Sequence, residues 1–307
     1  MKTLIVILGP TGVGKTETCL RVAGYFHIPV INADSRQIYR GIPIGTATPT
    51  HEQQLRTKHY MVEKLQIGEY YNASMFEDDV IILLNELFRS DDVALMSGGS
   101  MMYIDAVCNG MGDIPTVPDD LRQTMKRRLQ EEGLESLCEE LRRLDPEYYA
   151  IVDRHNYRRV VHALEIIHTT RQTFTSLRTG EKKQRPFNIL KIGLTRPREQ
   201  LYERINTRVD DMMKQGLLEE ALSVFPQRSF NALNTVGYKE LFAFFDGTWT
   251  LEEAIERIKG NTRRYCRKQL TWFQRDKDIH WIDLSKASAD DVVEYIRQQV
   301  RPTDDQP

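Results

Sequence analysis

Eight residues near the start of the chain have the types and spacing of a phosphate-binding loop. They read Gly9-Pro10-Thr11-Gly12-Val13-Gly14-Lys15-Thr16, which matches the pattern Gly-x4-Gly-Lys-Thr. The apolar run at residues 4–8 predicts a buried strand before the loop, and residues 17–26 predict a helix after it. This strand–loop–helix context is the one that the motif requires, so it favours a pyrophosphate-like ligand over a glycine-rich turn that binds nothing.

Each part of the loop has a chemical use. The glycines let backbone N–H groups turn inward on an anion, and the helix N-terminus adds partial positive charge. Lys15 supplies a point charge for phosphate oxygens, and the Thr16 hydroxyl can hold Mg²⁺. We therefore expect Mg²⁺ as a cofactor with Thr16 as its protein ligand, and a diphosphate site made by Gly9, Thr11, Gly12, Val13, Gly14, Lys15 and Thr16.

An acidic residue follows the second apolar segment, at residues 29–33. In the run Asn32-Ala33-Asp34-Ser35-Arg36-Gln37, Asp34 should emerge at the same sheet edge as Lys15. It could hold magnesium as a Walker B aspartate, act as a general base, or cap the helix that follows. The later strand at residues 92–96 ends in Ser97-Gly98-Gly99-Ser100 without an acid, which weakens an ATPase interpretation and favours Asp34 as a base.

The segment at residues 257–275 carries seven basic residues and no acidic one. On a helix, a spacing of four places Lys259, Arg263 and Arg267 in one stripe and Arg264 and Lys268 in another. Three aromatic residues are interleaved with them. A solvated helix face is one interpretation, but the missing acidic residues favour a phosphate-rich partner.

Composition limits the class of protein. The chain has 307 residues and a formal net charge of −2, which alone gives no reason to expect a nucleic-acid partner. The four cysteines form no Cys-x-x-Cys pair, which fits a reducing cytoplasm and excludes a structural zinc site. The first apolar run breaks too early for a secretory signal, and no stretch is long enough to span a membrane, so we expect a cytoplasmic protein without a membrane partner.

Apolar segments at residues 3–8, 29–33, 93–97, 189–194 and 280–284 alternate with helical patterns. This alternation predicts an α/β fold, in which a P-loop core has a parallel sheet with helices on both faces. Between residues 115 and 185 four helical patterns follow one another without a strand, which predicts an inserted small all-helical subdomain. The core domain would then span residues 1–114 and 186–307, with a frayed tail at residues 301–307.

Several segments together resemble the bacterial tRNA dimethylallyltransferases, which form the tRNA isopentenyltransferase family. The resemblance extends from residue 3 to about residue 275. The matching segments are residues 9–16, 32–40 (NADSRQIYR), 44–49 (IGTATP), 97–103 (SGGSMMY), 144–146 (LDP), 163–166 (ALEI), 236–240 (VGYKE) and 262–273 (TRRYCRKQLTWF).

The resemblance implies a reaction and a set of site residues. The family moves a dimethylallyl group from dimethylallyl diphosphate to N6 of the adenosine immediately 3′ of the tRNA anticodon. Lys15, Thr16, Asp34 and Arg208 then become catalytic candidates, with Arg208 as a diphosphate ligand and Asp34 as the general base. Residues that match tRNA-contacting positions, together with the basic stripes, are Asp34, Ser35, Arg36, Gln37, Ser100, Arg122, Arg158, Arg159, His162, Asn234, Gly237, Tyr238, Lys239, Arg263, Arg264, Arg267 and Lys268.

The sequence departs from the family pattern at several positions, and several of these lie on the side expected to meet tRNA. His162 stands where an arginine is common, Thr48 replaces a lysine, and Tyr60 replaces a histidine. An adenylate isopentenyltransferase, acting on free AMP, ADP or ATP, is the nearest alternative, and a P-loop small-molecule kinase or a non-catalytic tRNA-binding protein is more distant. The inserted helices and the basic segment favour tRNA, specifically an anticodon stem-loop, and we expect a monomer.

Overall fold

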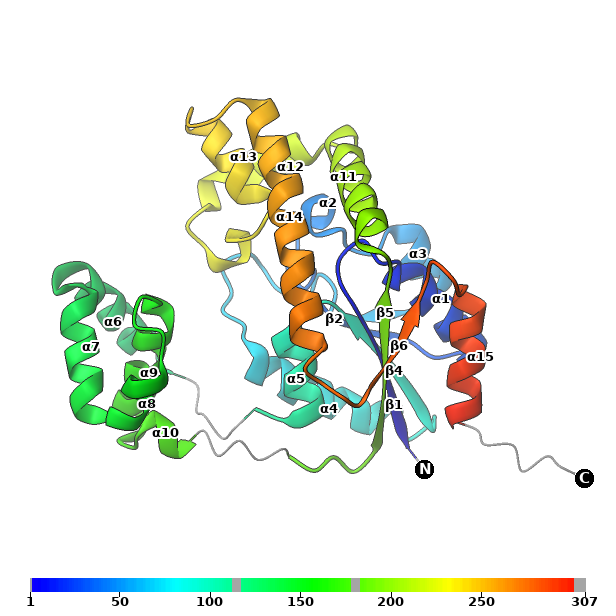
Figure 1. The fold of residues 1–307 in the computed structure, drawn as a ribbon, viewed down its shortest axis with the longest axis horizontal. Coiled ribbons are helices and arrows are strands. Elements are labelled where there is room, and N and C mark those ends of the chain that lie inside the picture. The colour runs from blue at the N-terminus through cyan, green and yellow to red at the C-terminus, as the bar shows by residue number, and fades with distance from the viewer. Residues whose placement is uncertain (1, 112–116, 178–182, 301–307) are drawn as a thin grey trace, which may run out of the picture. The chain divides into compact units, whose positions relative to one another are not determined.

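The computed structural model describes residues 2–111, 117–177 and 183–300 (Figure 1). Within these ranges the sheet has six strands in the order β3-β2-β4-β1-β5-β6, and each pairing between neighbours is parallel. The strands are β1 Thr3–Leu8, β2 Val30–Ala33, β3 His59–Tyr60, β4 Val93–Gly98, β5 Asn188–Thr195 and β6 Ile279–Asp283. Because the strands are parallel, the loops that follow β1, β2 and β4 leave the sheet at one edge.

One compact unit consists of Met1–Cys108 together with Arg185–Pro307, and it contains the whole sheet. Its helices are α1 Lys15–Phe26, α2 Pro43–Thr46, α3 His51–Arg56, α4 Ala73–Leu87, α5 Met101–Asn109, α11 Arg198–Lys214, α12 Leu217–Val224, α13 Tyr238–Phe245, α14 Leu251–Phe273 and α15 Ala289–Val300, with 3₁₀ turns at η1 Phe225–Gln227 and η2 Asn231–Leu233. The unit boundary falls at the last residue of α5, Asn109.

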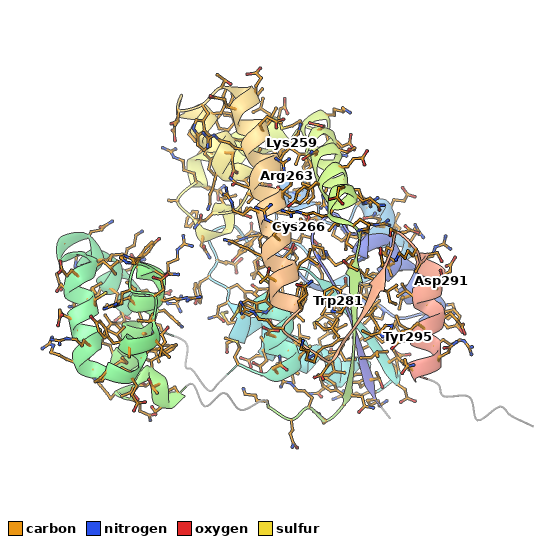
Figure 2. The ribbon with its side chains drawn as sticks, viewed as in Figure 1. Lys259, Arg263, Cys266, Trp281, Asp291 and Tyr295 are labelled. Atoms are coloured by element: carbon orange, nitrogen blue, oxygen red, sulfur yellow. The ribbon has the colours of Figure 1, made fainter. Side chains whose placement is uncertain are left out.

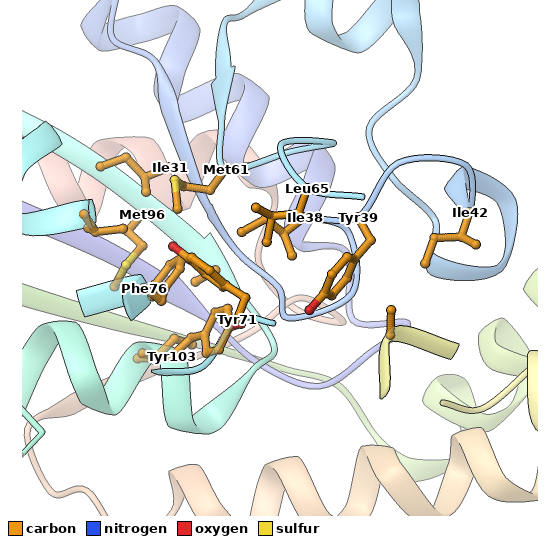
Figure 3. Close-up of a cluster of buried hydrophobic side chains, with 14 of the residues drawn as sticks. Ile31, Ile38, Tyr39, Ile42, Met61, Leu65, Tyr71, Phe76, Met96 and Tyr103 are labelled. Carbon is orange, nitrogen blue, oxygen red and sulfur yellow. The ribbon is translucent and has the colours of Figure 1, made fainter. Parts of the chain in front are cut away.

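Apolar side chains cover both faces of the sheet. In β1, Leu4, Val6 and Leu8 join one hydrophobic cluster, whereas Ile5 and Ile7 join another on the opposite face. A strand that is buried on both faces has a continuous apolar sequence, and for this reason β1 could be predicted from the sequence. Figure 3 shows part of the first cluster, in which Ile31 and Ile38 anchor the chain on either side of Asp34.

Asn109–Gln184 forms the second compact unit, which is helical in the residues that the structure describes. Its helices are α6 Asp119–Glu131, α7 Gly133–Leu144, α8 Pro146–Ile151, α9 Tyr157–Thr170 and α10 Phe174–Leu177. They pack around a separate apolar core that includes Leu137, Leu141 and Leu164. The buried Asp145 carboxylate accepts the N–H groups of Tyr148 at 3.0 Å and Thr175 at 2.8 Å, which joins α8 to α10.

The predicted α/β fold with a parallel sheet and helices on both faces is confirmed. The helical insertion, expected at residues 115–185, corresponds to the unit Asn109–Gln184. The tail expected at residues 301–307 lies outside the described residues. The strand β3 and the helices α2 and α3 have six residues or fewer, which is too short to give a periodic pattern. Within the described ranges, no helix is both long and apolar enough to cross a bilayer.

Candidate functional site

The phosphate-binding loop joins β1 to α1 at the carboxyl edge of the sheet. Gly9, Gly12 and Gly14 have positive φ angles of 152°, 82° and 117°, which L-residues with side chains rarely adopt. Gly14 caps α1 without a side-chain hydrogen bond, so the first N–H groups of this 12-residue helix are not satisfied by a capping side chain. The loop and helix thus have the geometry of an anion site.

Cationic side chains hold the loop carbonyls. Lys15 Nζ donates to the carbonyl oxygens of Gly9 and Pro10, both at 2.9 Å. Arg204 Nε donates to the Gly12 carbonyl at 2.7 Å, and Arg196 Nε donates to the Val13 carbonyl at 2.9 Å. Arg196 and Arg204 were not predicted from the sequence, although Arg204 lies one helical turn before Arg208 and Arg196 lies two residues after the strand predicted at residues 189–194.

The Thr11 N–H, which we expected to donate a hydrogen bond to the diphosphate, has a partner within the protein. It donates at 2.9 Å to Oε1 of Gln269, a residue of α14 that is 2% exposed. The structure therefore corrects the prediction for the Thr11 amide, because this N–H is already bound within the protein. Gln269 was also missed, although it lies in the matched segment TRRYCRKQLTWF.

Lys15, Arg208 and Asp34 influence one another electrostatically. Burial, followed by repulsion from Arg208, lowers the pKa of Lys15 to about 8, and the Asp34 carboxylate partly opposes this shift. Burial also lowers the pKa of Arg208, again against the attraction of Asp34. The structure thus brings these three predicted residues together at one sheet edge, and the concentration of positive charge there is suited to an anionic ligand.

Arg208 lies in α11 and lines a pocket of about 920 Å³ in the core unit. Gly12 and Thr16 from the phosphate-binding loop also line this pocket. Apolar groups of Ile44, Ala47 and other residues form a further part of the lining. The pocket therefore combines part of the anion-binding loop with apolar groups, and the carboxylates of Glu63, Glu203 and Asp211 also line it.

The turn after β2 is fixed by its own hydrogen bonds. Asp34 Oδ1 accepts the N–H groups of Arg36 at 2.9 Å and Gln37 at 3.3 Å. Residues 35–42 form no helix, so Asp34 is not the helix cap that we considered. It holds a turn instead, and both bonds end on one carboxylate oxygen.

Other residues of this turn form hydrogen bonds with other segments of the core unit. Arg36 donates to the Asn231 carbonyl at 2.7 Å, and Gln37 Nε2 donates to the Thr46 and Ala47 carbonyls at 2.9 and 3.0 Å. Ser35 N–H donates at 2.8 Å to the hydroxyl of Ser100, which is 7% exposed. Bonds within the protein thus occupy side chains that we expected to meet tRNA.

Tyr238 requires a correction. It is fully buried, and its hydroxyl donates to Glu220 at 2.5 Å, so it is not available to RNA in this structure. Its neighbour Gly237 is also buried and donates its N–H to Glu240, whereas Asn234 is half-buried and Lys239 is exposed. Of this predicted segment, Lys239 is the residue best placed for a partner.

The basic stripe of α14 divides into two parts. Lys259 forms ion pairs with Asp210 at 2.8 Å and Glu256 at 3.1 Å, so part of the stripe has acidic partners that we did not expect. Arg263 and Arg267 bond to Asn206 and Tyr202 of α11 (Figure 2 labels Lys259 and Arg263). Arg264, Arg267 and Lys268 are exposed, and Arg264 donates to Asn261 of the same helix at 2.8 Å.

The remaining predicted tRNA contacts lie in the helical unit. Arg158, Arg159 and His162 are all exposed on α9, which begins at the side-chain cap Asn156. Arg122 is half-buried in α6. The structure thus presents a cationic face on α9.

The donor set near the loop is compatible with magnesium. No group of three or more His, Cys, Asp or Glu side chains among the described residues could hold a metal ion. Mg²⁺ is commonly held by few protein oxygens together with phosphate oxygens and water, so a single hydroxyl such as Thr16 beside an anion cradle fits it.

Comparisons with known proteins identify the family. The family model described as IPP transferase matches residues 37–276. The chain is 55% identical to "tRNA dimethylallyltransferase 1" of Bacteroides thetaiotaomicron, over 97% of this chain and 96% of that protein.

Solved structures agree with this assignment. The tRNA isopentenylpyrophosphate transferase of Bacillus halodurans has a TM-score of 0.72 and 35% identity, covering 98% of this chain and 96% of that one. A eukaryotic dimethylallyltransferase solved acting on tRNA has a TM-score of 0.85 over 98% of this chain and 80% of that one, and at 24% identity it supports the fold alone. The predicted resemblance is confirmed: the chain belongs to the IPP transferase family of prenyl-transferring enzymes and is a relative of the bacterial tRNA dimethylallyltransferases.

Proposed function

We propose that the chain transfers a dimethylallyl group from dimethylallyl diphosphate to N6 of the adenosine immediately 3′ of a tRNA anticodon, releasing diphosphate. The observation that supports this donor is the pocket that joins Gly12, Thr16 and Arg208 to apolar groups of residues such as Ile44 and Ala47. A diphosphate ester with a short hydrocarbon tail matches both parts of this lining. Because tRNA is the proposed acceptor, we expect the protein to act in the cytoplasm.

The loop and its cations would stabilise the leaving group. When the allylic C–O bond breaks, positive charge develops on the prenyl carbon and negative charge on the departing diphosphate. The N–H groups at the start of α1, Lys15 and the Arg208 guanidinium supply opposing charge. Bound Mg²⁺, held through Thr16, would supply further charge neutralisation at the diphosphate.

Asp34 would take the proton that the acceptor loses. The amine nitrogen N6 attacks the prenyl carbon, the new C–N bond forms, and one N6 proton must leave. Asp34 Oδ1 accepts two backbone N–H groups, so we assign the proton to Oδ2. The adenosine would have to be extruded from its stack to reach this turn.

Exposed cations support a tRNA acceptor over a free nucleotide. Arg158 and Arg159 on α9 and Arg264 and Lys268 on α14 are exposed and could bind backbone phosphates. A free nucleotide has few phosphates and does not require cations on two separate helices. β4 also ends in Ser97 and Gly98 beside β1, a position at which an NTPase would carry a metal-binding acid, so a kinase is disfavoured.

The test is incubation with dimethylallyl diphosphate, Mg²⁺ and one acceptor, either tRNA or AMP, followed by nucleoside mass analysis. We expect a mass gain of one dimethylallyl group on adenosine from tRNA. Modified AMP with unmodified tRNA would instead support the adenylate isopentenyltransferase. Transfer of the γ-phosphoryl group of added ATP to a small molecule would support a kinase.

A further inference from the structure

The buried amide of Gln269 joins two loops at the sheet edge. Its Oε1 accepts the N–H of Thr11 in the phosphate-binding loop at 2.9 Å, and its Nε2 donates to the carbonyl of Gly99 after β4 at 2.8 Å. The side chain comes from α14 and is 2% exposed. One amide thus bonds to two loops more than 80 residues apart in sequence.

The connection continues from Gly99 to Asp34. The residue after Gly99 is Ser100, whose hydroxyl accepts the N–H of Ser35 at 2.8 Å and lies 3.2 Å from the Ser35 hydroxyl. Ser35 in turn follows Asp34 directly. A continuous path of hydrogen bonds and short chain segments therefore leads from the phosphate-binding loop through Gln269 to the turn that carries the proposed base.

We propose that Gln269 is a positioning residue that fixes the loop holding the donor diphosphate relative to the turn holding Asp34. This inference rests on the proposed prenyl transfer, because the distance between these two elements matters only if donor and acceptor react there. A displacement of about 1 Å between reacting groups can slow a reaction about 100-fold.

The uncharged amide of Gln269 meets two opposite hydrogen-bonding requirements. The Thr11 N–H needs an acceptor and the Gly99 carbonyl needs a donor, whereas a carboxylate only accepts and a thioether is at most a weak acceptor. A Cβ at position 99 would collide with Nε2 of Gln269, so a side chain there would displace this amide from the Gly99 carbonyl.

The first experiment compares Gln269→Met with Gln274→Met, an exposed glutamine at the end of the same helix. Circular dichroism would first confirm that both variants are folded. We expect the single-turnover rate of prenyl transfer to fall about 10- to 100-fold in Gln269→Met only. We also expect the Kd for inorganic pyrophosphate with Mg²⁺ to rise about fivefold, the equivalent of one hydrogen bond.

A second variant, Gln269→Glu, distinguishes a role of this side chain in hydrogen bonding from a role in packing alone. The measurement is the rate of prenyl transfer as a function of pH. Burial and the facing Gly99 carbonyl should raise the pKa of the new carboxyl. Its neutral form can donate to Gly99 and accept from Thr11, as the amide does. We therefore expect its rate, divided by the wild-type rate at the same pH, to rise from pH 8.5 to pH 6.5, and a constant ratio would contradict the bridge.

The third variant, Gly99→Ala, disturbs the same contact from the other loop and keeps Gln269. Its effect on rate should not add to that of Gln269→Met, since both remove one connection. The proposal is overturned if the folded Gln269→Met and Gly99→Ala variants keep wild-type rate and pyrophosphate affinity, or if their effects are fully additive. If the wild type modifies neither tRNA nor AMP, the proposed function fails, while the pyrophosphate affinities still report whether Gln269 orders the loop.

Discussion

The turn after β2 and the exposed face of α9 were both predicted to contact tRNA, but their side chains are in different physical states. In the turn, Arg36 and Gln37 donate to carbonyls of other core segments, and Ser35 is bound to Ser100. On α9, Arg158 and Arg159 are exposed. Each region belongs to a different compact unit.

This contrast distinguishes two roles that a residue can have in an RNA-modifying enzyme: holding a reacting group in place, or binding the RNA backbone. A bonded, partly buried side chain has lost its rotamer freedom and can hold a reacting group in place, but it cannot bind a phosphate without breaking an existing bond. Among the described residues, the exposed Arg158 has a hydrogen bond only to the hydroxyl of its neighbour Tyr157, at 3.2 Å, so it can reorient toward a phosphate at a smaller cost. We therefore expect variants at the sheet edge to change the chemical step or stability, and variants on exposed helix faces to change tRNA affinity.

The largest effect is expected for Asp34→Asn. The amide keeps an oxygen for the N–H groups of Arg36 and Gln37 but cannot accept the adenine proton at neutral pH. We expect the single-turnover rate to fall by about 10²–10⁴-fold with unchanged pyrophosphate affinity. A near-normal rate would exclude Asp34 as the base, and a defect removed by added Mg²⁺ would support a Walker B role instead.

Lys15→Ala and Thr16→Ala should have the next largest effect. Both residues belong to the anion-binding loop, and removing one preorganised stabilising group typically slows the chemical step by about 10²–10³-fold. The affinity for tRNA should stay near that of the wild type, as measured by filter binding. Equal losses of rate and tRNA affinity would show that the sheet edge also anchors the RNA.

Tyr238→Phe tests whether the buried Tyr238 stabilises the fold or contacts RNA. The variant removes the hydroxyl that bonds to Glu220 and to the Ile42 carbonyl, so we expect unfolding free energy to fall by about 1–3 kcal/mol. Tyr25→Phe, at an exposed tyrosine, is the matched control and should change stability little. A loss of tRNA affinity in Tyr238→Phe without a loss of stability would restore Tyr238 as an RNA contact.

The lowered pKa of Lys15 gives a pH prediction. Burial and Arg208 lower this pKa to about 8, and a bound diphosphate, being anionic, should raise it again. Binding then takes up a proton above pH 8, so pyrophosphate affinity should fall as pH rises, by up to about tenfold per pH unit. Calorimetry between pH 7.5 and pH 9.5 checks this, with Lys15→Ala as a control whose profile should be flatter.

The sequence predicted the sheet and the anion loop because both have strong local signals. β1 is a continuous apolar run, and the loop motif fixes its glycines and Lys15 at set spacings. It could not predict that Gln269 binds the Thr11 N–H, because the two residues are separated by 258 positions and only the folded chain brings them together. Nor could it distinguish the buried Tyr238 from the exposed Lys239, because the same segment supplies both.

The smallest effect is expected on the exposed face of α14, where the paired variant is Arg264→Gln with Lys268→Gln. Each phosphate contact contributes a slope of about −0.7 to −0.9 in log affinity against log salt concentration, so the slope should flatten by roughly one to two units. Lys259→Gln is the control, because Lys259 already pairs with Asp210 and Glu256. Pyrophosphate affinity should not change in any of these variants.

The measurement is tRNA affinity across a salt series for the wild type, the paired variant and the control. If the lines for the wild type and the paired variant are parallel, the face of α14 is only solvated. The same series with Arg158→Gln and Arg159→Gln would then show whether α9 alone carries the phosphate contacts. If neither pair changes the slope, exposure does not identify the RNA-binding residues, and the free nucleotide becomes the better acceptor candidate.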